Sequence, residues 1–285
     1  MKGIFNIYII VLIAVSMLSC NSKKETSSPE TASKFYTDSI FSSQLAENRK
    51  HNVYLPTGFN RETKYPIIYA TDGSNTIENS FYKLLLDSLI DNQIMKPVIL
   101  IASHSNSKIA DSTSSATGDG KKVYLQYRNF EYVNRQPTRP EDSLLVNRFR
   151  NHIIYFKDEL ISHVENEFNQ KIDKTDRYFY GVSNGAGFGL SLLHAYPDKI
   201  GTYICLSTFG GNIQNNLWKS NVAYPDLYLQ YGSDEPWFLK EEADFLKSTY
   251  AELNLHAEIK EFNGGHDYNK WQEAFTETII TLFKI

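Results

Sequence analysis

Residues 179–189 read FYGVSNGAGFG, and this stretch decides the fold because it joins a strand pattern to a helical one. The β-rich run 177–183 ends at Ser183, and residues 185–195 continue as a helix. Ser183 lies between Gly181 and Gly185 in the pattern G-x-S-x-G, which is typical of a nucleophilic serine on a sharp strand-to-helix turn. Side chains at both glycine positions would collide in such a turn. A serine in an ordinary glycine-rich turn remains the alternative on this motif alone.

Strand and helix patterns alternate on both sides of this stretch. This alternation predicts an α/β fold with a mostly parallel central sheet and helices on both faces, whose binding residues gather beyond the carboxyl ends of the strands. Two polar stretches fit no element, and both follow strand ends where they can wall a substrate pocket: an insertion at 104–147 and a loop at 208–222. Strands are predicted at 52–56, 65–71, 97–103, 177–183, 201–207, 226–232 and 256–262, and helices at 77–90, 148–168, 185–195, 239–253 and 268–283.

The N-terminus, MKGIFNIYIIVLIAVSMLSC, has the short apolar run of a signal peptide. Ser19-Cys20 is similar to the lipobox of bacterial lipoproteins, in which the cysteine carries lipid; an ordinary cleaved signal is the alternative. We expect a signal peptide at 1–20, a polar tether at 21–37 and a catalytic domain at 38–285. The protein is then exported and held by a lipid anchor in the bacterial cell envelope.

Charge and cysteine content exclude several classes of protein. The net charge is −4, from 29 basic and 33 acidic residues, which argues against a nucleic-acid partner. Of the two cysteines, Cys20 is assigned to lipid, so Cys205 is expected to be buried without a disulfide. The histidines lack ligand spacing such as H-E-x-x-H, so neither a metal nor another cofactor is expected.

A nucleophilic serine needs a base and an acid, which in this topology follow it in the order acid and then histidine. Of the three later histidines, His266 lies in FNGGHDYNKW, a glycine-bearing loop after the last strand, and is the predicted base. His194 falls within a helix and His256 starts a strand. Asp234 and Glu235 both follow a strand end, and spacing alone does not choose between them.

The segments VYLP, YPIIYATDG, RYFYGVSNGAGFGLSLLHAYPDKI, YLQYGSDE and GGHDYNKW carry a resemblance over roughly residues 38–285. They look like the esterase branch of the α/β-hydrolases, which includes enterochelin (siderophore) esterases, feruloyl esterase domains and esterase D-like proteins. The resemblance implies an α/β-hydrolase fold and a serine carboxylesterase with Ser183 as nucleophile and His266 as base. It favours Glu235 over Asp234, because the acid in such proteins often stands three residues after the strand-end glycine.

Further site residues follow from the same patterns. The N–H of Asn184, at the start of a helix, is a predicted oxyanion donor, and the resemblance implies a second one at Ser74 or Gly73. The resemblance of YRNFEYV to a stretch in some members of this branch implies Arg128 as a substrate contact, and Trp218, in the 208–222 loop, is a second predicted contact. The substrate classes left open are short acyl esters, acylated or feruloylated carbohydrates and siderophore esters. The alternatives are an acyltransferase on the same fold and a non-catalytic surface lipoprotein that binds glycans or siderophores; the oligomeric state is not predicted.

Overall fold

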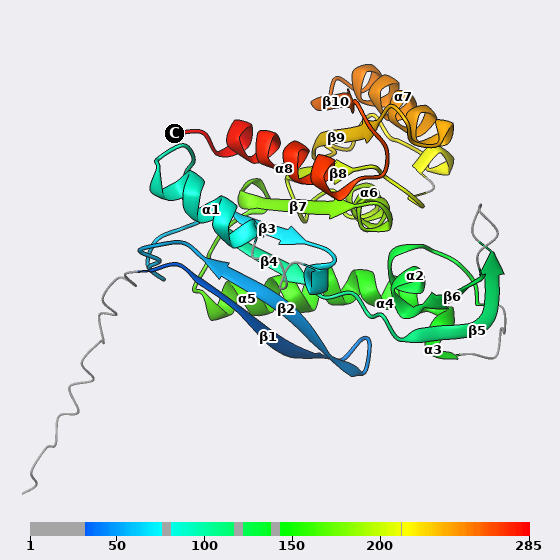
Figure 1. The fold of residues 1–285 in the computed structure, drawn as a ribbon, viewed down its shortest axis with the longest axis horizontal. Helices are drawn as coiled ribbons and strands as arrows, with labels where there is room; N and C mark the ends of the chain where they lie inside the picture. Colours follow the sequence, from blue (N-terminus) through cyan, green and yellow to red (C-terminus); the bar gives the residue numbers. More distant parts are fainter. Residues whose placement is uncertain (1–31, 76–80, 117–121, 138–142, 212) are drawn as a thin grey trace, which may run out of the picture.

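The computed structural model describes residues 32–75, 81–116, 122–137, 143–211 and 213–285. Eight strands form one sheet in the order β1-β2-β4-β3-β7-β8-β9-β10 (Figure 1). The strands are β1 (Lys34–Ser42), β2 (Glu47–Leu55), β3 (Ile67–Ala70), β4 (Ile99–Ser103), β7 (Arg177–Val182), β8 (Thr202–Leu206), β9 (Asp226–Gly232) and β10 (Ala257–Phe262). The pairs β1–β2 and β2–β4 are antiparallel, and every pair from β4 to β10 is parallel. The predicted mostly parallel sheet is confirmed.

Helices cover both faces of this sheet, as predicted. One apolar core lies between the sheet and α1 (Phe81–Asp91) and α8 (Tyr268–Phe283). The other lies against α4 (Arg148–Ile154), α5 (Ile161–Glu167), α6 (Asn184–Ala195) and α7 (Trp237–Glu252). Neighbouring residues of a central strand pack into the cores on opposite faces of the sheet, as Phe179 and Tyr180 of β7 do. The central strands therefore read as continuous apolar runs, because both of their faces are buried.

The domain begins earlier than the sequence predicted. β1 starts at Lys34, within the predicted tether, and pairs with β2 from Lys34↔Leu55 to Ser42↔Glu47. The boundary at residues 37 and 38 is therefore wrong. The strand escaped detection because only Ile40 and Ser42 of its nine residues are buried, so its apolar signal is weak. The predicted signal peptide, Cys20 and the tether up to residue 31 lie outside the described residues.

The insertion at 104–147 contains strands and helices that its polar composition did not predict. Its described parts form a hairpin, β5 (Ile109–Ala116) and β6 (Lys122–Gln126), and two short helices, α2 (Tyr127–Tyr132) and α3 (Ser143–Val146). Glu131 of α2 is fully buried and ion-paired with Arg49 and Arg148, at 2.8 and 2.6 Å. These pairs fasten α2 to β2 and α4, so the insertion is part of the domain.

Two smaller features complete the fold. The helix predicted at 148–168 is continuous but contains a π-helical segment, η2 (Tyr155–Leu160), between α4 and α5. Cys205 is buried and unpaired, as predicted. In the described part of the chain, no helix is both long and apolar enough to cross a membrane.

Candidate active site

Ser183 occupies a strained turn between β7 and α6. Its backbone lies in the left-handed region, with φ 53° and ψ −126°. A Cβ on Gly181 would lie 2.7 Å from the carbonyl carbon of Gly185, and a Cβ on Gly185 would lie 2.2 Å from Thr71 Oγ1. The steric reason predicted for both glycines is confirmed.

The same strain recurs at the two strands beside β7. Asp72 follows β3 with φ 57°, and Ser207 follows β8 with φ 50°. Neither residue is glycine, so each conformation costs free energy that the surrounding contacts must offset. In the sheet order β3-β7-β8, the three strained residues lie next to one another at the carboxyl ends of the strands.

His266 lies between a carboxylate and the serine. Its Nε2 is 3.0 Å from Ser183 Oγ, and its Nδ1 is 2.6 Å from Glu235 Oε1. The Glu235 side chain is 1% exposed, and its other oxygen accepts a hydrogen bond from the Gly232 N–H at 2.7 Å. Burial acts to raise the pKa of Glu235, but hydrogen bonds from His266, Gly232 and Ser207 outweigh it, so this pKa lies below its ordinary value.

The competing candidates lie elsewhere. Asp234 is exposed and accepts a hydrogen bond from its neighbour Ser233 at 3.2 Å. His194 Nε2 is 3.1 Å from the carbonyl oxygen of Leu217, and His256 Nε2 is 3.3 Å from a tyrosine hydroxyl. The structure thus brings together Ser183, His266 and Glu235. The side chains of Asp234, His194 and His256 lie apart from them.

Two residues that the sequence analysis did not assign support the acid and the histidine. The Trp271 indole N–H donates to Ser207 Oγ at 2.7 Å, and the Ser207 side chain is hydrogen-bonded to Glu235. The Trp271 ring also meets the His266 ring edge-on, with centroids 4.6 Å apart. Trp271 is the last residue of the quoted GGHDYNKW motif, which was a usable signal; Ser207 carries none, because strand-end serines are common.

Backbone N–H groups flank the serine. Asn184 is the first residue of α6, so its N–H lies at the positive end of the helix dipole. The 3₁₀ turn η1 (Gly73–Asn75) holds the other predicted donors. The Gly73 carbonyl accepts a hydrogen bond from Asn52 Nδ2 at 2.7 Å. Because a trans peptide is planar, the Ser74 N–H points to the side opposite this carbonyl.

Arg128 is engaged within the protein. Its Nε and Nη2 donate to the two oxygens of Asp72 at 2.6 and 2.7 Å, and its Nη1 donates to Asn184 Oδ1 at 3.3 Å. The Asp72 N–H in turn donates to the hydroxyl of Tyr132 at 3.2 Å. These contacts join α2 to the loop after β3 and to the first residue of α6. A substrate contact by Arg128 stays a prediction, with two sides of its guanidinium already occupied.

Trp218 does not lie beside the serine, so a substrate contact by this residue stays a prediction. It packs against Tyr224 and His194, with ring centroids 4.5 and 5.0 Å away. His194 lies near the far end of α6, about 16 Å from Ser183 at the rise of an α-helix. The aromatic side chain completes the core under the 208–222 loop.

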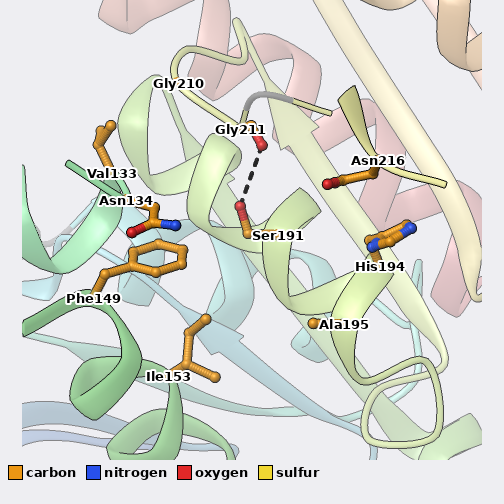
Figure 2. A pocket seen from close by; sticks show the side chains of 10 residues that line it. All are labelled: Val133, Asn134, Phe149, Ile153, Ser191, His194, Ala195, Gly210, Gly211 and Asn216. Atoms are coloured by element: carbon orange, nitrogen blue, oxygen red, sulfur yellow. Dashed lines mark hydrogen bonds between the residues drawn. The ribbon is translucent and has the colours of Figure 1, made fainter. Parts of the chain in front are cut away.

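A cavity of about 520 Å³ lies along α6 between the two stretches predicted to wall a pocket (Figure 2). At one end, a Cβ on Gly210 would lie 3.4 Å from Asn184 Nδ2, so this end adjoins the residue after Ser183. The cavity is lined by Val133, Asn134, Phe149, Ile153, Ser191, His194, Ala195, Gly210, Gly211 and Asn216. The insertion and the 208–222 loop thus line a single cavity.

Comparison with known proteins identifies the family of the chain. The model of the family described as "Putative esterase" matches residues 42–282. The chain belongs to this esterase family. An endo-1,4-beta-xylanase/feruloyl esterase from Xylanibacter ruminicola is 23% identical over 261 residues, which are 88% of this chain and 31% of that protein. The chain thus spans about a third of the length of that relative.

Solved esterase structures share the fold. A ferulic acid esterase superposes with a TM-score of 0.70 at 16% identity, covering 89% of this chain and 99% of that one. The enterobactin esterase of Shigella flexneri gives 0.66 at 16% identity, over 90% and 61% of the two chains. A ferulic acid esterase of Anaeromyces mucronatus gives 0.63 at 16% identity, over 87% and 90%. The predicted α/β-hydrolase fold is confirmed.

We predict that Gly185→Ala destabilises the protein because its new methyl meets Thr71 Oγ1. Overpacking of this kind costs about 1–3 kcal/mol of the free energy of unfolding. Thr71 Oγ1 is buried without a hydrogen-bond partner among the described residues, so Thr71→Ala removes the nearest obstacle, at 2.2 Å, without breaking a hydrogen bond. Urea unfolding of the two single variants and the double variant measures the coupling. An equal loss from Gly185→Ala in both backgrounds would contradict this contact.

Proposed function

We propose that the protein is a serine carboxylesterase that hydrolyses an ester through an acyl-enzyme on Ser183. The observation that supports this most directly is the continuous chain of contacts from Glu235 through His266 to Ser183 Oγ. Family membership supports the same class of reaction. A serine hydroxyl is a weak nucleophile until a base accepts its proton, and the distance of 3.0 Å between His266 Nε2 and Ser183 Oγ suits that transfer.

In the proposed reaction, Ser183 Oγ attacks the ester carbonyl carbon while its proton moves to His266 Nε2. The tetrahedral intermediate collapses, the carbon–oxygen bond to the alcohol breaks, and His266 gives its proton to the leaving oxygen. Water then loses a proton to His266 and attacks the acyl carbon, which releases the acid and returns the proton to Ser183. Glu235 keeps the proton on Nδ1 and stabilises the imidazolium.

The oxyanion of each intermediate would accept hydrogen bonds from the N–H groups of Asn184 and Ser74. The first is supported by its place at the start of α6. The second is supported by the Asn52–Gly73 hydrogen bond, which orients the Gly73–Ser74 peptide. Gly73 is the alternative second donor. Fixed donors of this kind stabilise the developing charge without reorganising.

We propose an aromatic acyl ester of a carbohydrate or a siderophore ester as the substrate. The cavity along α6 is large enough for part of such a ligand and combines apolar side chains such as Phe149 and Ile153 with the amides of Asn134 and Asn216. The names of the structural neighbours, which include ferulic acid and enterobactin esterases, support the same choice. Because one fold serves many substrates, transfer of the acyl group to another acceptor uses the same triad.

Ser183→Ala tests the nucleophile. Loss of a triad serine typically lowers kcat by about 10⁴–10⁶-fold, and we expect this for hydrolysis of p-nitrophenyl acetate and butyrate, with an unchanged circular dichroism spectrum. Ser248→Ala is the matched control, because Ser248 is exposed on α7 and bonds only its own helix at Asp244. A rate retained in Ser183→Ala would refute the assignment, and a folded wild type that reacts with no ester would favour the binding-protein alternative.

Glu235→Gln and Asp234→Asn separate the two candidate acids. The neutral amide at position 235 lacks the negative charge that stabilises the His266 imidazolium. We therefore expect kcat to fall by about 10²–10⁴-fold. The side chain of the exposed Asp234 bonds to Ser233, whereas His266 bonds to Glu235, so Asp234→Asn should act within about threefold of wild type. Steady-state kinetics of both variants with p-nitrophenyl butyrate show which of the two residues is the catalytic acid. Equal effects at the two positions would contradict the geometry.

We propose that Cys20 carries lipid and holds the enzyme in the bacterial cell envelope, as the lipobox-like sequence indicates. Radiolabelled fatty acid should enter the full-length chain and be absent from Cys20→Ser. Incorporation that is equal in the two proteins would exclude this anchor.

A further inference from the structure

A second cluster of chemically active side chains lies away from Ser183, where the β1–β2 hairpin packs on α5. Asp38 of β1 and His51 of β2 are directly opposite each other in the register. His163 and Glu167 are one helical turn apart on α5, with His163 Nε2 and Glu167 Oε2 at 3.4 Å. One ligand atom from each of Asp38, His51 and His163 lies within 4.8 Å of the others.

The alternation of the strands explains why these side chains meet. Val53, two residues after His51, and Ile40, two after Asp38, belong to the core that also contains Ile161 and Val164 of α5. Residues two apart in a strand share a face of the sheet. His51 and Asp38 therefore continue the α5-facing rows of the two strands, where apolar residues would ordinarily stand.

The cluster leaves buried polar atoms without partners. His51 is fully buried, and neither of its ring nitrogens has a hydrogen-bond partner among the described residues. His163 Nε2 and Glu167 Oε2 lie 3.4 Å from each other, but neither atom makes a hydrogen bond among the described residues. Buried polar groups are normally paired, so a fully buried imidazole with two unpaired nitrogens beside Asp38 and His163 needs an explanation.

We propose that Asp38, His51 and His163 bind one divalent cation of the Zn²⁺ type, with Glu167, which lies beside His163, as the fourth ligand. Two imidazoles and two carboxylates form a donor set that suits Zn²⁺, which takes four nitrogen, oxygen or sulfur ligands at about 2.0–2.2 Å in a tetrahedron. Such bonds place the ligand atoms about 3.4 Å apart. The 3.4 Å between His163 Nε2 and Glu167 Oε2 matches this spacing. The ligand atoms of Asp38, His51 and His163 lie up to 4.8 Å apart and need a movement of about 1 Å, which the side chains of Asp38 and His163 can make because both are at least partly exposed.

The cation would have a structural role and no part in ester hydrolysis. His51 lies on β2, which is separated from β7 and Ser183 by β4 and β3. Three strand spacings amount to about 14 Å across the sheet. A bound cation would join β1, β2 and α5 at the edge of the domain where β1, with mostly exposed residues, buries little apolar surface. Binding to the folded state alone stabilises that state by mass action.

The test is a titration of tag-free, chelator-treated protein with Zn²⁺ by calorimetry and with Co²⁺ by visible absorption. We expect one cation per chain, the intense absorption of tetrahedral Co²⁺ and a higher Tm with Zn²⁺. His163→Ala and Asp38→Asn should each weaken Zn²⁺ binding by at least about 100-fold, because losing a ligand costs more than the 10–100-fold typical of outer-sphere changes. Both positions are at least partly exposed, so the variants should fold.

His256→Ala is the matched control, because His256 is an exposed histidine on the opposite edge of the sheet beside β10. Its affinity for Zn²⁺ should equal that of wild type, and p-nitrophenyl butyrate hydrolysis should be the same with and without Zn²⁺ in all four proteins. The absence of saturable binding by wild type would overturn the proposal. So would binding that survives both His163→Ala and Asp38→Asn unchanged.

Discussion

The backbone turn at Ser183 is the constraint on which the rest of the site depends. A serine held at positive φ between a strand and a helix points its hydroxyl away from the sheet, and it requires glycine on both sides. The constraint extends to the next strand, because Gly185 can approach Thr71 so closely only without a side chain. The close contact of Gly185 with Thr71 therefore sets the position of α6 relative to the loop after β3.

Hydrogen bonds from distant segments then hold the strained strand ends in place. Arg128 of the insertion donates hydrogen bonds to Asp72 at the end of β3, and Trp271 of α8 donates one to Ser207 at the end of β8. Ser207 is hydrogen-bonded to Glu235, Glu235 to His266, and His266 to the nucleophile Ser183. Strain at three adjacent strand ends is therefore offset by contacts from the insertion on one side and from the last helix on the other. The arrangement preorganises the groups that the proposed reaction needs.

Local patterns in the sequence predicted the parts of this arrangement that are local in the chain. The apolar runs of the central strands, the elbow at Ser183 and the loop that carries His266 all have signals within about ten residues. Spacing left Asp234 and Glu235 equivalent, because the difference between them is burial, and only Glu235 is turned inward.

The edge strand β1 was missed because it buries few of its side chains. The pairing of Glu131 with Arg49 and Arg148 spans up to 82 residues of chain and leaves no local pattern. The distance of Trp218 from Ser183 was not predictable, because a loop sequence does not indicate which end of a helix the loop will cover.

The most direct test of the account is covalent labelling of the wild-type protein with a fluorophosphonate, followed by peptide mapping. The account predicts one phosphonyl group per chain, attached to Ser183, because that hydroxyl is the one with His266 Nε2 at 3.0 Å and Glu235 behind it. Folded protein that takes up no label, or that is labelled at another serine, would contradict the proposal that the Ser183–His266–Glu235 chain is a working nucleophile.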